Sequence, residues 1–309
     1  MDGAVKARSR QAALRGGLVL ALAFSVGPAR AAPPPVAGVV LTGSVSLDPF
    51  RGLGAWIDIY DQSLWNDPEA AVIGLGAAGV RTLYLQTCND GCPGPIHRPA
   101  LVGRFIDAAH AGGMHVVAWY LPGLHNLGRD LARAVKAITF QSGTGQRFDA
   151  VAMDIESRAV GAVGLRNQRL LKLSQQIRAR VGSSYALGAI VPPYFADWKP
   201  FPYRGLAGLY DVFLPMAYFT GYTDGPRAAH DEISRNVRSI RGGTGDPDIP
   251  IHVIAGIADD MSGSETRAAV HAGLELGVLG LSLYDADTSG PEDWSRLRAV
   301  PRPGPATAA

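Results

Sequence analysis

One pattern recurs eight times along this 309-residue chain: a short apolar run, a polar or glycine-bearing tip, and a longer segment with helical periodicity. The runs predict strands at 55–60, 81–86, 115–120, 150–155, 186–191, 212–218, 252–257 and 280–284. Between and after them, helices are expected at 68–77, 99–111, 127–140, 165–181, 228–240, 265–276 and 292–300. Prolines interrupt the fifth connection, where we expect a long loop with short helical pieces. Eight such units predict a single (β/α)8 TIM barrel, with a doubly wound sheet as the alternative.

The first 31 residues have the features of a secretory signal peptide. Four basic residues precede an apolar run at 18–26, and Ala29-Arg30-Ala31 supplies a small-x-small cleavage site. An uncleaved anchor is the alternative, but this run is too short to cross a bilayer. We therefore expect a secreted, extracellular protein with the barrel at 32–300 and a loose tail at 301–309.

Removal of the signal peptide would change the formal net charge from +2 to −2, because five basic residues and one acidic residue leave with it. The remaining chain has no basic stripe, which argues against a nucleic acid or an anionic membrane surface as a partner. We expect a monomer.

Cys88 and Cys92 are the only cysteines, and in an exported protein such a pair is expected to be bridged. The intervening Asn89, Asp90 and Gly91 favour the tight turn that the bridge requires. A zinc site needs about four ligands, and no second cysteine pair or spaced histidine pair lies nearby. We expect neither a metal ion nor a cofactor.

The segment 148–157, FDAVAMDIES, ends an apolar strand on two acids. Because side chains alternate along a strand, Ala150, Ala152, Asp154 and Glu156 share one face, and the bulky apolar residues between them share the other. The two acids therefore point together at the carboxyl end of a strand, which is where barrels of this type carry their chemistry.

Other motifs in the chain do not indicate a function. The segment 74–79, GLGAAG, fits G-x-G-x-x-G but follows a helix and precedes a strand, the reverse of a dinucleotide site. The chain has no phosphate-binding loop motif and no G-x-S-x-G. Its seven histidines are scattered without H-E-x-x-H, and His115 and His252 begin expected strands, where a structural role is favoured.

Polar and aromatic side chains gather at the expected strand tips. They are Trp56, Asp58, Tyr60, Gln86, Trp119, Tyr120, Asp154, Glu156, Met216, Tyr218, Tyr284, Asp285 and Asp287. Sugar rings stack on aromatic faces, and glycosidic cleavage needs a carboxyl group to protonate the leaving oxygen. The set therefore favours a carbohydrate site, although any single aromatic residue could equally be part of the barrel's packing.

The residues around Asp154 resemble a known family. FDAVAMDIE is similar to the fourth-strand signature D-x-x-D-x-D-x-E of the family 18 glycoside hydrolases, the chitinase-like barrels, with Ala152 in place of the middle Asp. The segment 210–218 looks like that family's sixth strand, which ends in Met-x-Tyr, although Phe219 follows where the family has Asp. Tyr284 stands where the family has Trp, and the Ser-x-Gly-Gly of its third strand is absent.

The resemblance implies that Glu156 is the general acid, that Asp154 orients the substrate's 2-acetamido group, and that Tyr218 hydrogen-bonds this group as its oxygen attacks the anomeric carbon. Asp58, Gln86 and Asp285, with the aromatic residues and Met216, would contact the substrate. If the enzyme instead uses two carboxylates, Asp58, Asp285 or Asp287 would supply the second.

Two functions are therefore open. One is a secreted glycoside hydrolase acting on a polysaccharide, for example one that contains N-acetylhexosamine. The other is a catalytically inactive glycan-binding barrel, for which the loss of an acid at Ala152 argues. A hydrolase acting on another class of substrate is a weaker third possibility, because fold alone does not fix chemistry.

Overall fold

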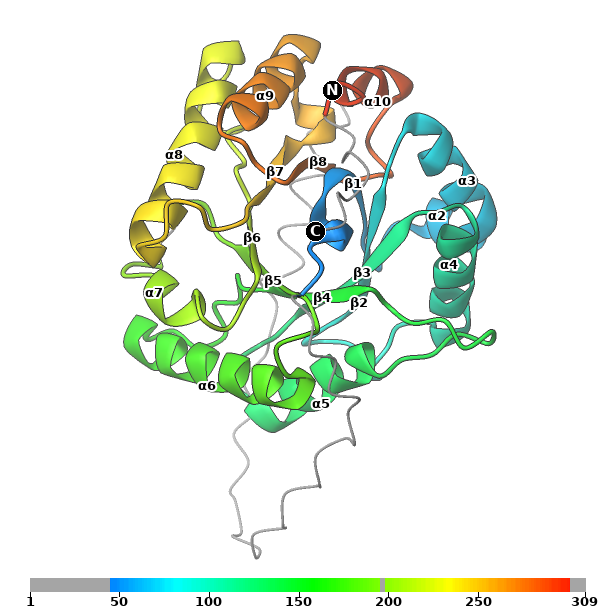
Figure 1. Ribbon diagram of the computed structural model, residues 1–309, viewed down its shortest axis with the longest axis vertical. Helices are drawn as coiled ribbons and strands as arrows, with labels where there is room; N and C mark the ends of the chain where they lie inside the picture. Colours follow the sequence, from blue (N-terminus) through cyan, green and yellow to red (C-terminus); the bar gives the residue numbers. More distant parts are fainter. Residues whose placement is uncertain (1–44, 195–197, 301–309) are drawn as a thin grey trace, which may run out of the picture. The chain divides into compact units, whose positions relative to one another are not determined.

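The computed structural model describes residues 45–194 and 198–300. Eight parallel strands form one sheet in the order β6-β5-β4-β3-β2-β1-β8-β7. Parallel bridges at Phe213–Ile251 and Met216–Ile254 bring the outer strands β6 and β7 together, so the sheet closes on itself. The strands are β1 (Gly52–Ile57), β2 (Thr82–Asn89), β3 (His115–Leu121), β4 (Ala150–Asp154), β5 (Leu187–Val191), β6 (Val212–Pro215), β7 (His252–Ile257) and β8 (Gly280–Tyr284). The prediction of a single (β/α)8 barrel is confirmed (Figure 1).

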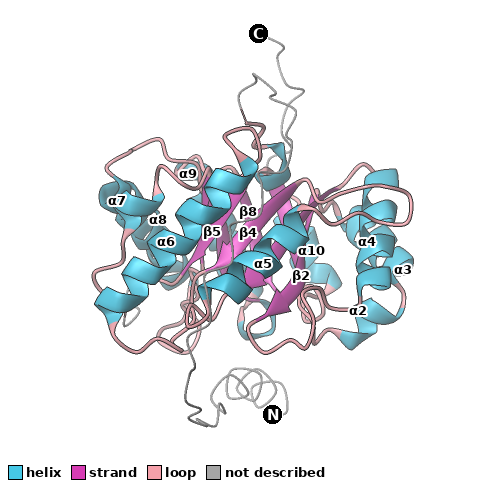
Figure 2. Cartoon of the chain, turned by 90° about the horizontal axis from the view of Figure 1, so that it is seen from below, coloured by secondary structure: helices cyan, strands magenta, loops and turns pink. Residues whose placement is uncertain are grey.

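Helices surround the sheet on its outer side (Figures 1 and 2). They are α2 (Gln62–Asn66), α3 (Pro68–Ala78), α4 (Pro99–Ala111), α5 (Leu127–Ile138), α6 (Val163–Val181), α7 (Tyr203–Leu206), α8 (Pro226–Thr244), α9 (Gly263–Glu275) and α10 (Pro291–Leu297), with short 3-10 turns η2 (Asp48–Phe50) and η3 (Ala258–Asp260). In the part of the fifth connection that the structure describes, the only helix is the four-residue α7, as the prolines there predict.

Local sequence explains where α3 begins and ends. The side chain of Asp67 accepts a hydrogen bond from the Ala70 amide and so satisfies one of the free donors of the first turn. Gly79 ends the helix with a φ of 97°, a conformation that glycine adopts without a steric penalty. The glycine-rich motif at 74–79 is therefore a helix end, as predicted.

The expected alternation along β4 is present. Ala150 and Ala152 belong to the buried cluster inside the barrel, whereas Val151, Met153 and Ile155 pack in the larger core between the strands and the helices. Small residues inside and bulky residues outside fit a closed barrel, because its interior has limited room.

Large aromatic rings fill part of the barrel interior. Trp56 stacks on Tyr84 with ring centroids 4.2 Å apart. Gly54, two residues before Trp56 on β1, leaves space for this pair, since a Cβ there would lie 2.6 Å from the Tyr84 ring. At the base of the barrel, a Cβ at Gly280 would lie 2.3 Å from Nδ1 of His252.

His252 is a structural residue, as expected. It is fully buried, its ring nitrogens contact the Phe50 carbonyl oxygen at 2.9 Å and the Ser282 hydroxyl at 3.0 Å, and burial lowers its pKa to about 4.

Six of the eight expected strands differ in their bounds by one to three residues, and two of these differences concern candidate site residues. β1 begins at Gly52 and ends at Ile57, so Asp58 and Tyr60 lie in the loop beyond it. β6 ends at Pro215, which lacks an amide hydrogen for the ladder, and Tyr218 lies beyond the strand rather than within it. The loops that carry these side chains begin at the carboxyl ends of β1 and β6, so the side chains still lie at the carboxyl end of the barrel.

The expected signal peptide at 1–31 and the tail at 301–309 lie outside the described residues. Among the helices that the structure describes, none has the length and apolar character needed to cross a membrane.

Candidate active site

Asp154 and Glu156 lie at the carboxyl end of β4. Asp154, 6% exposed, is the last strand residue, and its Oδ1 accepts no hydrogen bond from any residue that the structure describes. Burial raises the pKa of Asp154, and the negative charge of Glu156 raises it further. Burial also raises the pKa of Glu156, although Arg158 opposes part of this effect. Both acids therefore bind a proton more tightly than a free carboxylic acid does, and their proximity disfavours the state in which both are ionised.

Tyr218 lies close to these acids. Burial raises the pKa of its hydroxyl, and the charges of Glu156, Asp154 and Asp285 raise it further. Its ring lies 6.3 Å from that of Tyr284, which is the last residue of β8. The loop after β6 therefore places a phenol within electrostatic range of acids from both β4 and the β8 loop.

A second group of acids, all buried, lies at the ends of β1 and β8. Carboxylate oxygens of Asp58, Asp61 and Asp285 lie within 4.8 Å of one another. The Tyr284 hydroxyl donates to Asp58 Oδ2 at 2.7 Å, and the Asp58 amide donates to Asp61 Oδ2 at 2.7 Å. Burial and the charges of Asp58 and Asp285 raise the pKa of Asp61 to about 9.

A group of oxygen ligands of this kind is what hard cations such as Ca²⁺ prefer. Burial and the neighbouring charges raise the pKa of Asp61 to about 9, so a proton on Asp61 is another way to relieve the repulsion among these acids. Asp61 was not among the residues singled out from the sequence. The signal that could have found it is its spacing of three residues from Asp58, just after a strand.

Three of the expected substrate-binding residues lie inside the barrel. Trp56 is 1% exposed and donates from Nε1 to the Ser282 hydroxyl at 2.8 Å, and Trp119 is 4% exposed and donates to the Tyr84 carbonyl oxygen at 3.3 Å. Met216 is buried in the same interior cluster. Their burial favours packing beneath the site over direct stacking on a sugar.

Tyr120 and Gln86 also take structural positions. Tyr120 points to the outside of the barrel, where its hydroxyl donates to Asp130 Oδ1 of α5 at 2.7 Å. The sequence expectation of a cleft residue is corrected here, because Tyr120 follows Trp119 and adjacent strand residues face opposite sides. Gln86 accepts a hydrogen bond from the Ile59 amide at 2.9 Å and so holds the loop that carries Asp58.

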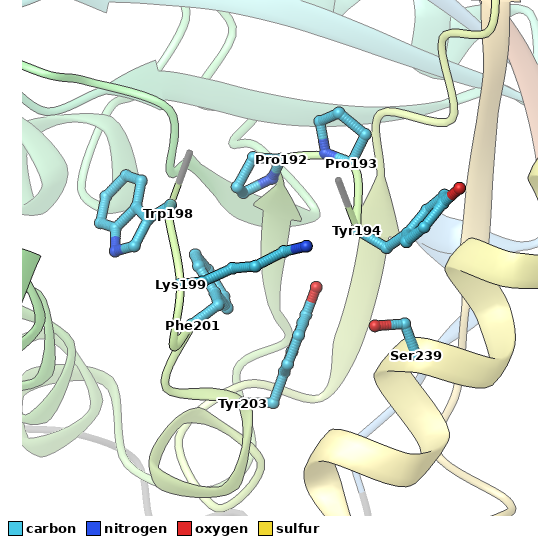
Figure 3. A pocket seen from close by; sticks show the side chains of 8 residues that line it. All are labelled: Pro192, Pro193, Tyr194, Trp198, Lys199, Phe201, Tyr203 and Ser239. Atoms are coloured by element: carbon cyan, nitrogen blue, oxygen red, sulfur yellow. The ribbon is translucent and has the colours of Figure 1, made fainter. Parts of the chain in front are cut away.

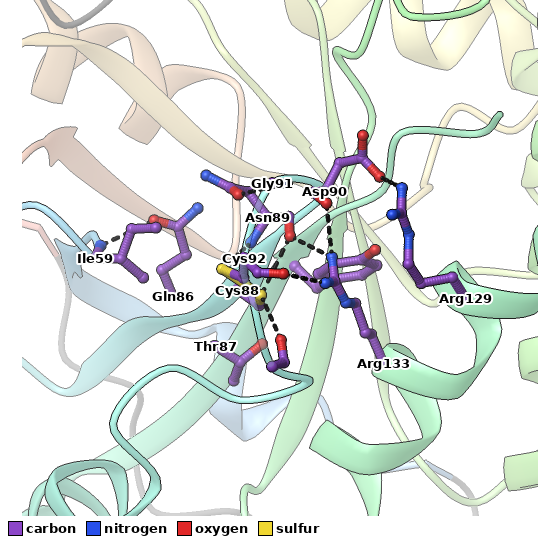
Figure 4. The surroundings of a disulfide bond; sticks show 12 residues. Ile59, Gln86, Thr87, Cys88, Asn89, Asp90, Gly91, Cys92, Arg129 and Arg133 are labelled. Atoms are coloured by element: carbon purple, nitrogen blue, oxygen red, sulfur yellow. Dashed lines mark hydrogen bonds and ion pairs between the residues drawn. A yellow bond between two sulfur atoms is a disulfide. The ribbon is translucent and has the colours of Figure 1, made fainter. Parts of the chain in front are cut away.

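Cys88 and Cys92 are bridged, as predicted, at the end of β2 (Figure 4). The guanidinium of Arg133 donates to the carbonyl oxygens of Asn89, at 2.6 Å, and of Asp90, at 3.0 Å, so α5 holds the loop from one side. On the other side, Asn89 Nδ2 donates to the hydroxyl of the exposed Tyr60 at 3.1 Å. The bridge therefore fixes a loop beside that of Asp58.

A cavity of about 220 Å³ lies between the loop after β5, α7 and α8 (Figure 3). The amine of Lys199 and the hydroxyl of Tyr203 point toward one another inside it, with Ser239 opposite. Its lining also includes Trp198 and Phe201. This stretch was expected only to be an irregular connection, although its three aromatic residues Trp198, Phe201 and Tyr203 could have marked it.

No family model and no curated protein matches the sequence. Solved structures match the fold. An endo-β-1,4-mannanase from Thermotoga petrophila is 10% identical over 83% of this chain and 78% of its own, with a TM-score of 0.62. A plant class V chitinase from Cycas revoluta in complex with (GlcNAc)3 is 11% identical over 80% of this chain and 98% of its own, with a TM-score of 0.60.

A chitinase from Chromobacterium violaceum is 14% identical over 81% of this chain and 98% of its own, with a TM-score of 0.56. At these identities the likeness shows the fold alone. The chain has a chitinase-like (β/α)8 barrel, and the recognition of this fold from the sequence is confirmed.

Proposed function

We propose that this protein is an exported glycoside hydrolase that cleaves a polysaccharide containing N-acetylhexosamine, with Glu156 as the general acid. The observation that carries the proposal is the pair of crowded acids at the end of β4, with the Tyr218 phenol in electrostatic range of both. The chitinase-like fold supports it, because such barrels carry their chemistry at the carboxyl ends of the strands.

The environment of Glu156 suits an acid. Burial raises its pKa, which keeps the carboxyl group protonated closer to neutral pH, where a proton donor to the leaving oxygen is useful. Glu156 is also less buried than Asp154, so it is the more accessible of the two acids.

Asp154 and Tyr218 would act on the substrate's own nucleophile. The Oδ1 of Asp154, buried and without a partner among the described residues, would accept the N–H of a 2-acetamido group. The Tyr218 hydroxyl would donate to the carbonyl oxygen of this group as it attacks the anomeric carbon. This substrate-assisted route needs no enzyme nucleophile. In a two-carboxylate route, we favour Asp285 as the second acid. Its negative charge and that of Glu156 both raise the pKa of Tyr218, so both acids lie near the same hydroxyl.

A glycan-binding protein without activity is the second candidate. Ala152 places a buried methyl group on the inner face next to Asp154, where the resembling family has an acid that interacts with it. An Asp154 that holds its proton without such a neighbour could bind a sugar amide and still fail to drive cleavage.

The test is hydrolysis of soluble chitin oligosaccharides, peptidoglycan glycan strands and a mannan. The rate is measured as the release of reducing ends. We expect Glu156→Gln to lower the rate roughly 10²–10⁴-fold through the lost proton transfer, with its melting temperature nearly unchanged. The matched control is Glu292→Gln, which changes an exposed acid of α10 paired with Arg296 and should retain full activity.

Two results would decide against the proposal. If wild type hydrolyses a glycan and Glu156→Gln hydrolyses it equally fast, Glu156 is not the acid. If wild type binds glycans in a calorimeter but cleaves none of them, the glycan-binding candidate replaces the enzyme.

A further inference from the structure

Two histidines and a glutamate far apart in the sequence meet on the outer surface of the barrel. His230 lies near the start of α8, and His271 and Glu275 lie on α9, which runs beside α8 (Figure 1). The imidazole nitrogens and the carboxylate oxygen that these residues can offer all lie within 4.8 Å of one another. We propose that His230, His271 and Glu275 bind a transition-metal ion, Zn²⁺ foremost, that clamps α8 to α9.

The spacing of the three side chains fits a metal ion. His271 and Glu275 are four residues apart, so they share one face of α9. His230 Nε2 lies 2.7 Å from Glu275 Oε2, and His271 Nδ1 lies 3.5 Å from Glu275 Oε1. Ligands about 2.0–2.1 Å from a tetrahedral zinc ion lie about 3.4 Å apart, so a small opening of the His230–Glu275 contact suffices.

The donor set selects the kind of metal. Two imidazoles and one carboxylate suit Zn²⁺, Ni²⁺ or Cu²⁺, whereas Mg²⁺ and Ca²⁺ prefer oxygen ligands alone. The side chains are 33%, 67% and 51% exposed for His230, His271 and Glu275, so an ion can enter and water can complete its coordination.

A further acid lies beside His230. Asp231 Oδ1 lies 3.7 Å from His230 Nδ1, the ring nitrogen opposite the one that faces Glu275. This distance is longer than a hydrogen bond, so Asp231 adds negative charge near the three ligands without fixing the imidazole ring. Negative charge beside the site favours the binding of a cation.

The site is independent of the proposed hydrolase activity, because the three ligands stand on the outer helices. Its expected effect is on stability, since an ion that binds only the folded chain raises the melting temperature. The histidines' scatter in the sequence hid the site, and only the packing of α8 against α9 brings them together.

The experiment uses untagged full-length protein stripped of metal with a chelator and then titrated with Zn²⁺. We expect one ion per chain by calorimetry, and a rise in Tm on the order of 5 °C at a hundredfold excess over Kd. His271→Ala and Glu275→Gln should each weaken binding at least tenfold. Both side chains are largely exposed, so these variants should fold.

Two matched controls bound the result. Leu274→Ala changes an exposed neighbour on α9, and His125→Ala removes a half-exposed histidine elsewhere; both should bind Zn²⁺ as wild type does. Mg²⁺ should leave Tm unchanged. Absence of zinc binding by wild type, unchanged affinity in His271→Ala, or loss of binding in His125→Ala would overturn the proposal.

Discussion

One aspartate lies at each end of β4, and the pKa values of the two are shifted in opposite directions. Asp149, just before the strand, contacts His110 Nε2 at 3.0 Å and accepts from the Val116 amide at 2.7 Å, with His115 Nδ1 at 3.6 Å. Burial alone would raise its pKa, but these hydrogen bonds outweigh burial and hold the pKa of Asp149 below its usual range. Asp154, at the other end, has Glu156 as a neighbour and a raised pKa.

The same contrast holds on the next strand but one. Asp211 precedes β6 and accepts from Arg178 and from the Leu187 amide, each at 2.7 Å, whereas Tyr218 beyond β6 faces acids. The amino end of the barrel therefore uses its acids to tie strands to helices. The carboxyl end keeps acids together at a cost in stability, which is typical of functional sites.

The largest effect is expected at the crowded end. Asp154→Asn should lower hydrolysis of acetamido sugars roughly 10²–10³-fold, because a neutral amide replaces the carboxylate that would accept the acetamido N–H, and a neutral acceptor binds it more weakly. Its Tm should stay level or rise, since one of two repelling acids is gone. Initial rates and calorimetric melts measure both quantities. A variant with full activity and a lower Tm would show that Asp154 has a structural role, like Asp149.

Asp61→Asn tests how the acids at the carboxyl end of the barrel make the free energy of unfolding depend on pH. The folded-state pKa of Asp61, about 9, is above the unfolded value of about 3.9, so between these pH values only the folded state keeps the proton. Stability is thus lost as pH rises through this window. From pH 5 to 8 we expect wild type to lose on the order of 4 kcal/mol more than Asp61→Asn, read from urea melts at each pH. Parallel pH curves for the two proteins would contradict this.

Asp149→Asn should show the reverse pattern at the other end. We expect a loss of about 1.5–3 kcal/mol in the free energy of unfolding, because hydrogen bonds to a charged acceptor are replaced by weaker ones. Activity at 25 °C should be retained. His110→Ala should reproduce part of the loss, and the double variant should lose less than the sum of the two single losses. Strictly additive losses would mean that the pair does not interact.

Tyr218→Phe is expected to have the smallest effect. Removal of one hydroxyl from the loop after β6 should slow turnover about tenfold, equivalent to roughly 1.4 kcal/mol, with little change in Tm. Tyr185→Phe is a matched control near the amino end, where the hydroxyl contacts the Phe148 carbonyl oxygen at 3.5 Å. A drop in Tm without a change in rate would assign Tyr218 to packing.

The sequence was sufficient for the barrel because its periodicity is local. β7 and β8 match their expected bounds, since each is a short and mainly apolar run. β1 was placed too late because Gly52 and Gly54 weaken a strand pattern, although the packing of Tyr84 requires the second of them.

The site was only partly predictable. The placement of Asp154 and Glu156 together at the end of β4 was predictable, because their spacing of two follows the strand period. Asp61 was missed although its spacing from Asp58 was visible, because its burial beside Asp285 is decided by tertiary packing. The burial of Trp56 depends likewise on a partner from a distant strand, Ser282. Which aromatic ring faces a ligand and which fills the interior is decided by tertiary packing, and periodicity does not carry that information.

The glycines inside the barrel also constrain how this sequence can change over evolutionary time. Tyr84 occupies the volume that a side chain at Gly54 would need, and Leu214 and Phe50 occupy that of Gly188. A larger residue at either glycine is tolerable only after its neighbour has become smaller. Such paired positions allow substitutions in one order and block the reverse order. Relatives of this chain should therefore exchange bulk between adjacent strands while keeping the total volume inside the barrel nearly constant.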